Sequence, residues 1–159
     1  MADRALRGVS LPGVGALTIE VVDESLWSVR FAETQVQDAG ASTVADAVVA
    51  WFERYSGGSP GHLDVPFATR GTEFQREVWA GLRHIGWGQT WTYAQLAAHV
   101  GRPKGAQAVG AANGANPWAV IVPCHRVIGS DGGLVGYAGG LDRKRRLLAY
   151  EGAMSGILF

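Results

Sequence analysis

Hydrophobic and polar positions alternate over two segments near the start of the chain. Residues 15–22 and 26–32 flank the turn "DES", and in the second segment Trp27, Val29 and Phe31 are separated by polar side chains. A period of two is typical of strands with one buried face, so the pattern predicts a half-buried β-hairpin.

A helical period follows the hairpin. Ser42 is a candidate N-cap, and apolar residues then recur at helical spacing until "SGG" ends the run, at Val44, Val48, Val49, Phe52 and Tyr55. We expect this helix to pack on the hairpin. The stretch "HLDVPFA" at 62–68 is expected to add a strand.

Short capped helices are predicted after residue 70. Thr72 and Gln75 stand in capping-box register at the start of "TEFQREVWAGLRH", and Thr92 and Gln95 repeat the pattern at the start of "TYAQLAAHVG". Pro103 suits the first turn of a third helix, "PKGAQAVGAAN". Two short helices joined by "GR" resemble a helix-turn-helix.

The third of these helices consists almost entirely of small residues, among them Gly105, Ala106, Ala108 and Gly110. Such a helix is either a close-packed core helix or one whose surface enters a groove too narrow for bulky side chains. After the break at "NGANP", the run "WAVIV" predicts a buried strand that leads into "PCHRV".

The composition is that of a folded chain, with 159 residues of which 47% are hydrophobic. The single cysteine, Cys124, can form neither an internal disulfide nor a zinc site built on paired thiolates. His62, His84 and His99 show no ligand spacing, so we expect no metal site. With no signal peptide or membrane span in the sequence, a cytoplasmic location is expected.

Charge is distributed unevenly along the chain. Residues 1–68 carry four basic and nine acidic side chains, whereas residues 69–159 carry ten basic and five acidic ones. The basic half suits a polyanionic partner, most simply a nucleic acid. The alternative is an ordinary solvated helix surface, such as residues 143–146.

Cys124 has neighbours that suit a reactive thiol. A lone cysteine is often only a small core residue, but His125 can act as a base, Pro123 restricts the backbone, and Arg126 adds positive potential that favours the thiolate. In an extended strand adjacent side chains face opposite ways. Contact between Cys124 and His125 therefore requires a bridging water or a turn.

A carboxylate that could orient His125 lies in the last predicted helix. In "LDRKRRLLAYEG", Glu151 shares a helix face with Leu147 and Leu148, so it is expected to point inward and to pair with His125. The alternative is a glutamate at a frayed helix end.

An ordered set of motifs resembles one known family. The set comprises "TYAQLA", Asn116-Pro117, "PCHRV", "GYAGG" and "LLAYEG", and it is similar to the O6-alkylguanine-DNA alkyltransferases from about Gly71 to Gly152. The resemblance implies an α/β domain at 1–70, a small antiparallel sheet with a helix of the RNase H-like kind. It implies a mainly α, winged-helix-like DNA-binding and catalytic domain at 71–159.

The resemblance also implies roles for individual residues in alkyl transfer. Cys124 would accept the alkyl group after His125 draws its proton through a water, and Glu151 would orient His125. Asn116 would brace the turn that presents the cysteine, and Tyr93 would donate a hydrogen bond to the departing guanine.

Further positions are implied to contact the flipped base and the DNA. Tyr137 would flank the pocket, the carbonyls of Cys124 and Val127 would recognise the exocyclic amine, and the Ala138 amide would face the alkylated oxygen. The small helix, with Ala106 and Gly110 on its surface and Arg126 nearby, would approach the minor groove of double-stranded DNA. Gln107 stands where most relatives carry an arginine that fills the gap left by the flipped base. The resemblance implies a monomer without a cofactor.

The chemistry of a thiol acceptor agrees with this function. Attack on an sp³ carbon needs a soft nucleophile, and the resulting thioether is not readily cleaved by water, so one turnover per molecule is expected. One rival is an alkyltransferase-like protein that binds the lesion without repair, although those relatives usually carry tryptophan in place of the cysteine. The other is a cysteine hydrolase built on Cys124, His125 and Glu151.

Overall fold

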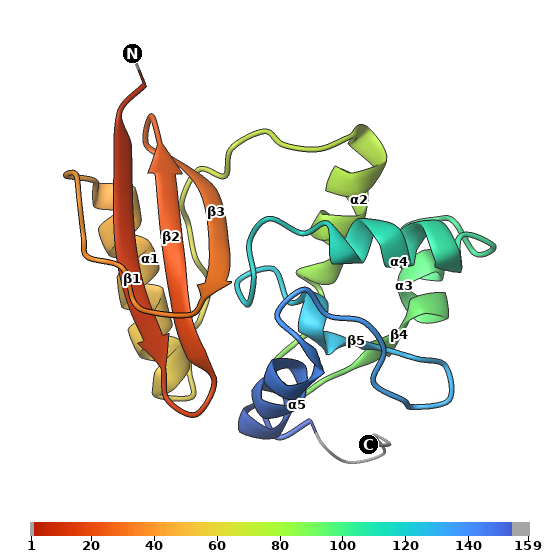
Figure 1. The fold of residues 1–159 in the computed structure, drawn as a ribbon. Helices are drawn as coiled ribbons and strands as arrows, with labels where there is room; N and C mark the ends of the chain where they lie inside the picture. The colour runs from red at the N-terminus through yellow and green to blue at the C-terminus, as the bar shows by residue number, and fades with distance from the viewer. Residues whose placement is uncertain (1, 154–159) are drawn as a thin grey trace. The chain divides into compact units, whose positions relative to one another are not determined.

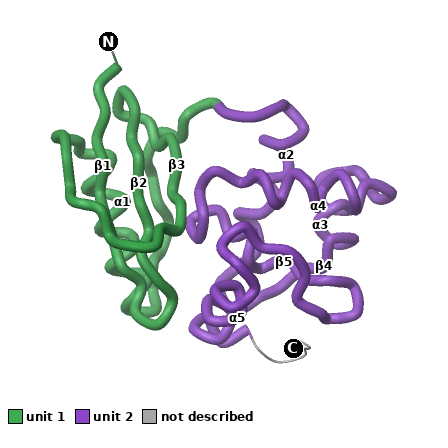
Figure 2. Tube along the Cα trace, in the orientation of Figure 1, with its two compact units in different colours: residues 1–69 green, residues 70–159 purple. Residues whose placement is uncertain are grey.

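Three antiparallel strands form the sheet at the start of the chain: β1 (Arg4–Leu11), β2 (Gly15–Val22) and β3 (Ser25–Ala32), in that order (Figure 1). The computed structural model describes residues 2–153 and divides into two units, Met1–Thr69 and Arg70–Phe159 (Figure 2). The hairpin expected from the alternating pattern is confirmed as β2 and β3.

Helix α1 (Thr43–Ser56) covers one face of this sheet, as expected. Its N-cap is Ser42, whose Oγ accepts a hydrogen bond from the Ala45 amide at 2.9 Å. The apolar stripe of α1 packs against the side chains of β2 that are fully buried, Leu17 and Ile19 among them. Helix and sheet therefore share one hydrophobic core.

Strand β1 was not predicted, and it contains a buried cation. The Arg7 side chain is 8% exposed and donates from Nη1 to the carbonyls of Leu6, Ala39 and Gly40. Asp46 on α1 accepts from Nε at 3.1 Å. Arg7 thus joins the edge strand, the segment that runs alongside it and α1.

The prediction of a strand at 62–68 is wrong. This segment pairs with β3 only through a single bridge between Leu26 and Phe67, flanked by hydrogen bonds from the Leu26 amide to Pro66 and from the Ala68 amide to Leu26. Pro66 has no amide proton to extend a ladder, so pairing ends there.

The second unit is mainly helical. Its helices are α2 (Glu73–Leu82), α3 (Tyr93–His99), α4 (Ala106–Gly114) and α5 (Leu141–Tyr150), with a 3₁₀ turn, η1 (Cys124–Arg126). Both predicted capping boxes are present, at Thr72 with Gln75 and at Thr92 with Gln95. A two-residue parallel pair joins β4 (Trp91–Thr92) to β5 (Val127–Ile128).

Two local predictions in this unit are wrong. Pro103 lies in a turn before α4, whose N-cap is Gly105, so the proline does not start the helix. The run 118–122 is buried except at Ala119, but it is not a strand, because Val120 adopts a left-handed backbone conformation (φ 70°) that breaks extended pairing. The chain bends at the point where the sequence pattern indicated an extended strand.

Within residues 2–153, no helix combines the length and the apolar composition needed to cross a membrane. The architecture is a mixed α/β unit with a three-stranded antiparallel sheet, followed by a mainly helical unit.

Arg7 provides a test of how the first unit is held together. Arg7→Leu should lower the free energy of unfolding by about 2 kcal/mol, because a charged donor that bridges buried carbonyls is lost. Asp46→Ala should change it by less than about 0.5 kcal/mol, since that carboxylate is 69% exposed. Urea unfolding followed by circular dichroism measures both, and equal effects would contradict the assignment to the carbonyl bonds.

Candidate active site

Cys124 opens a 3₁₀ turn at the end of a tightly held bend. Asn116 organises this bend: its Nδ2 donates to the Val122 carbonyl at 2.8 Å, and its Oδ1 accepts from the Trp118 amide at 3.0 Å. The Cys124 side chain is buried, with 7% of the residue exposed. The turn required for Cys124 and His125 to cooperate is therefore present in place of the expected strand.

The bend carries backbone strain. Val120 is β-branched, 1% exposed and in the left-handed region, a conformation that costs on the order of 1–3 kcal/mol for such a residue. Asn116 holds the backbone on both sides of Val120, at Trp118 and Val122, and burial of the valine fixes it in place. The strain is maintained at the segment that positions the thiol.

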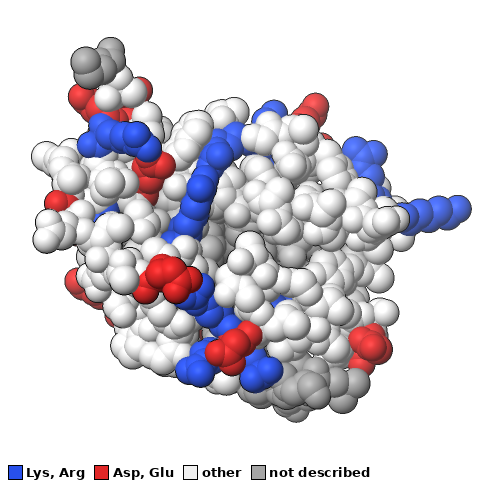
Figure 3. All heavy atoms as spheres, in the orientation of Figure 1, with Lys and Arg blue, Asp and Glu red and all other residues white. Residues whose placement is uncertain are grey.

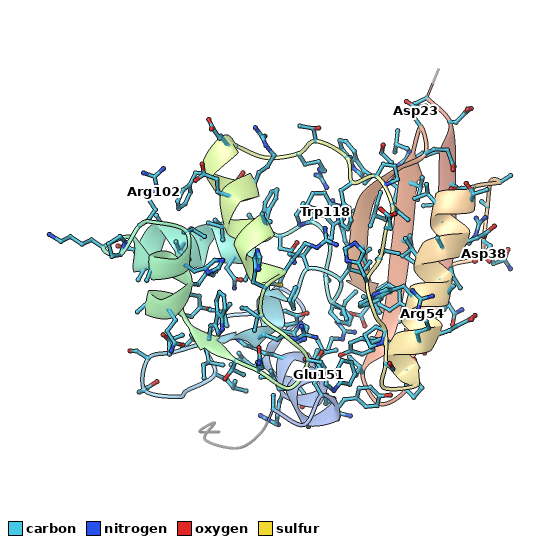
Figure 4. All side chains as sticks on the ribbon, turned by 180° about the vertical axis from the view of Figure 1, so that it is seen from behind. Asp23, Asp38, Arg54, Arg102, Trp118 and Glu151 are labelled. Carbon is cyan, nitrogen blue, oxygen red and sulfur yellow. The ribbon has the colours of Figure 1, made fainter. Side chains whose placement is uncertain are left out.

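His125 and Glu151 form the predicted pair. His125 Nε2 lies 2.8 Å from Glu151 Oε2, and both side chains are fully buried. Glu151 caps the end of α5 (Figure 4) and accepts a second hydrogen bond, at 2.7 Å, from Arg126 Nε. Burial by itself raises the pKa of Glu151, but the interactions with His125 and Arg126 outweigh it and lower the pKa to about 2.

This pairing leaves one ring nitrogen of His125 for other chemistry. With Nε2 bonded to a carboxylate, the proton is assigned to Nε2. Nδ1 is buried and has no hydrogen-bond partner among the described residues. His125 is thus arranged to accept a proton at Nδ1.

Arg126 has a different position from the one expected. Its side chain is buried and bonds to Glu151 and, from Nη1, to the Ile85 carbonyl at 2.6 Å. The charge of Arg126 is therefore compensated by Glu151, and the cation that acts on the Cys124 thiol comes from another residue.

That cation is Lys144, which sequence reasoning had grouped with a solvated basic surface. Lys144 is fully buried, and Nζ donates to the carbonyls of Val135 at 2.8 Å and Gly136 at 3.3 Å. Burial lowers the pKa of Lys144 to about 8, while the charge of Cys124 acts to raise it. The position of Lys144 three residues before Leu147 on the buried face of α5 was the available signal.

The thiol itself experiences opposing influences. Burial raises the pKa of Cys124, whereas a hydrogen bond from Asn116 and the positive charge of Lys144 lower it. Lys144 also holds the loop at 135–136, so one side chain links loop position to thiol ionisation.

Tyr93 lies on the other side of the site, at the first position of α3. The pairing of β4 with β5 fixes the start of α3 beside the segment that follows Cys124. Tyr93 Oη lies 3.5 Å from the Val135 carbonyl, and the ring packs under Gly110 of α4. Burial raises the pKa of Tyr93, as does the charge of Cys124, so the phenol keeps its proton at neutral pH.

The remaining predicted residues fall into an inner and an outer group. Tyr137 packs edge-on to His125 with ring centroids 6.4 Å apart, and Val127 is buried in β5. Gln107 is exposed on α4, whereas Ala106 is half-buried and Ala138 is exposed in the loop before α5. No group of three or more His, Cys, Asp or Glu side chains within residues 2–153 could hold a metal ion.

The outer face of α4 is lined by small residues and lies next to basic side chains. Ala108, Ala111 and Gly114 are exposed along it, and Arg102 projects from the turn between α3 and α4 (Figure 4). Figure 3 shows basic side chains extending beyond this end of the unit. Such a surface suits close approach to an anionic groove.

Lys144 generates a prediction about thiol reactivity. Lys144→Met keeps a buried chain but removes the charge, so the pKa of Cys124 rises further and thiolate becomes scarcer at a given pH. Alkylation by iodoacetamide follows the thiolate of this single cysteine, and at about pH 7, where Lys144 is charged, it should slow by roughly tenfold. Because the charge of Lys144 is itself lost as pH rises through about 8, the difference should shrink above that pH.

Arg145→Met, on the exposed side of the same helix, is the matched control and should leave the rate within about twofold. An unchanged pH profile of alkylation in Lys144→Met would show that the charge of Lys144 does not influence ionisation of the Cys124 thiol.

Comparison with known proteins agrees with this geometry. Residues 73–153 match the family model described as 6-O-methylguanine DNA methyltransferase, DNA binding domain. A methylated-DNA–protein-cysteine methyltransferase of Salmonella typhimurium is 65% identical over 85 residues, which cover 54% of this chain and 50% of the relative. That match thus spans only half the length of the Salmonella protein.

Longer matches include the first unit as well. The methylated-DNA–protein-cysteine methyltransferase of Mycolicibacterium paratuberculosis is 41% identical over 143 residues, 87% of each chain. The crystal structure of Mycobacterium tuberculosis O6-methylguanine methyltransferase aligns with a TM-score of 0.81 at 38% identity, covering 94% of this chain and 93% of that one. A structure of the same mycobacterial protein in complex with DNA aligns with a TM-score of 0.80. The chain therefore belongs to the 6-O-methylguanine DNA methyltransferase family.

Proposed function

We propose that this protein repairs O6-alkylguanine in double-stranded DNA by moving the alkyl group irreversibly to Cys124. The observation that carries the proposal is the buried thiol held beside a His125–Glu151 pair and the Lys144 cation. The named activity of a relative that is 41% identical over 87% of the chain supports it. Each molecule acts once, because a thioether is stable in water and the chain has no second thiol for exchange.

The first step is removal of the thiol proton. It passes from Cys124 Sγ through a water to Nδ1 of His125, the ring nitrogen that Glu151 does not occupy. Glu151 holds the imidazole in the required tautomer and stabilises its protonated form. Lys144 offsets the cost of a buried thiolate.

The second step is displacement at the alkyl carbon. A bond forms between Sγ and that carbon while the carbon–O6 bond breaks, and its electron pair goes to the guanine. Tyr93 supplies a proton to a ring nitrogen so that guanine leaves neutral, and the proton held by His125 returns to Tyr93 through solvent. The raised pKa of Tyr93 keeps the donor protonated until this moment.

The loop before α5 completes the pocket for the alkylated base. The Ala138 amide faces O6 and Tyr137 flanks the ring, while the carbonyls of Cys124 and Val127 recognise the exocyclic amine. Lys144 keeps this loop in place through Val135 and Gly136.

DNA binding is assigned to the two helices α3 and α4 as a helix-turn-helix within a winged-helix-like domain at 71–159. The lesion must leave the base stack to reach a buried thiol. The face of α4 that carries small residues, with Ala106 and Gly110 half-buried beside it, suits the minor groove, and Gln107 fills part of the gap in the duplex. The unit at 1–70 is of RNase H-like type, and the protein acts as a cytoplasmic monomer.

The first experiment is mass spectrometry of the intact protein and its peptides after mixing with a duplex that carries one O6-methylguanine. One methyl group per molecule is expected, on the peptide that contains Cys124 and absent in Cys124→Ala. Binding without modification would instead identify a lesion-binding protein. Release of alcohol from an activated ester over many turnovers would identify a cysteine hydrolase.

Gln107 provides a second prediction. Gln107 is shorter than arginine and uncharged, so flipping lacks a stacking and ionic contribution of roughly 1–3 kcal/mol. Gln107→Arg should therefore speed repair of duplex DNA about tenfold in single-turnover assays, while iodoacetamide reactivity of Cys124 stays unchanged. An equal repair rate in both proteins would show that Gln107 does not take part in flipping.

A further inference from the structure

Asn113 is a buried polar residue that the proposed reaction does not use. It lies on the inner face of α4 together with Val109 and Ala112, and it is 4% exposed. A leucine would fill such a position in a helix without burying an amide. The buried amide therefore needs hydrogen-bond partners to offset its burial.

The amide of Asn113 reaches the two groups at the centre of the site. Its Nδ2 donates to the Cys124 carbonyl at 3.4 Å. This orientation is the reasonable one, since exchanging nitrogen and oxygen would place two oxygens face to face. The side chain also makes a hydrogen-bonding contact with Tyr93; burial, the largest effect, raises the pKa of that phenol, and this contact acts to lower it.

The other end of the amide has no partner. Oδ1 of Asn113 is buried and makes no hydrogen bond within the part of the chain that the structure describes. An unsatisfied buried acceptor is destabilising, and most such atoms in proteins are paired. A donor supplied by a ligand would remove this cost.

The chemistry of the lesion supplies one such donor. Alkylation at O6 removes the proton from N1, so the ring nitrogens N1, N3 and N7 are all acceptors. The exocyclic amine is then the only hydrogen-bond donor on the base. Among the groups of the flipped base, only the amine can thus donate to a free acceptor in this pocket, and an O4-alkylated thymine offers no equivalent group.

Building on the proposed function, we propose that Asn113 is a specificity-determining residue whose Oδ1 accepts a hydrogen bond from the exocyclic amine of the flipped guanine. The amine has two N–H groups: one donates to Asn113 Oδ1, and the other is shared by the Cys124 and Val127 carbonyls, so a side chain of α4 and the backbone of the cysteine turn recognise it together. One helix then carries two functions, with Gln107 facing the duplex and Asn113 facing the extruded base.

The test pairs a protein change with a change in the base. Single-turnover methyl transfer is measured for the wild type and Asn113→Leu on duplexes with O6-methylguanine or with O6-methylhypoxanthine, which lacks the amine. Asn113→Leu should slow transfer from O6-methylguanine about tenfold, the effect of one lost hydrogen bond. Transfer from O6-methylhypoxanthine should stay within about twofold, so the preference of the wild type for guanine shrinks by the same factor of about ten.

Two further variants serve as controls for this comparison. Asn113→Ala removes the same acceptor without added bulk and should give the same loss of preference if the leucine variant folds poorly. Gln107→Ala, on the outer face of α4, should change both rates by an equal factor, because Gln107 is assigned to the duplex and not to the amine of the extruded base.

An equal loss on both bases in the Asn113 variants would overturn the proposal and assign Asn113 to support of Cys124 or Tyr93. If the wild type transferred a methyl group from neither duplex, the proposed function itself would be wrong, and the proposal for Asn113 would be wrong as well.

Discussion

A buried carboxylate, Glu151, joins the end of α5 to the turn that carries the thiol. A carboxylate out of water is costly unless it is paired and hydrogen-bonded, and Glu151 has both His125 and Arg126 as partners at 2.7–2.8 Å. Both partners follow Cys124 directly in the chain. Displacing either element would leave a buried charge without compensation, so the position of the cysteine is tied to the position of α5.

The segment on the other side of Cys124 is held by a different means. Asn116 fixes the bend through Trp118 and Val122, and between them Val120 stays in a strained backbone conformation. The reactive thiol is therefore fixed from both directions, by an ion pair after it and a side-chain clamp before it. Such fixed geometry reduces the rearrangement that the reaction requires.

Polar side chains that contact Cys124 or influence its ionisation come from three separate elements. Tyr93 begins α3, Asn113 lies on the inner face of α4, and Lys144 lies on the inner face of α5. Two of them, Tyr93 and Lys144, meet at the Val135 carbonyl, which links the loop over the site to both helices. The loop at 135–136 is thus tied both to the first turn of α3 and to α5.

Local features of the sequence determined the hairpin, the N-caps at Ser42, Thr72 and Thr92, and the pairing of His125 with Glu151, because each depends on residues a few positions apart or on a helical face. Ordered motifs around Cys124 identified the family. Tertiary structure alone decided the bend at Val120, the single bridge in place of the strand expected at 62–68, the burial of Lys144 and the inward position of Asn113. These depend on which distant groups meet: only the fold shows that the Val135 and Gly136 carbonyls offset the burial of a lysine charge, and only the fold places an asparagine of α4 against the cysteine carbonyl.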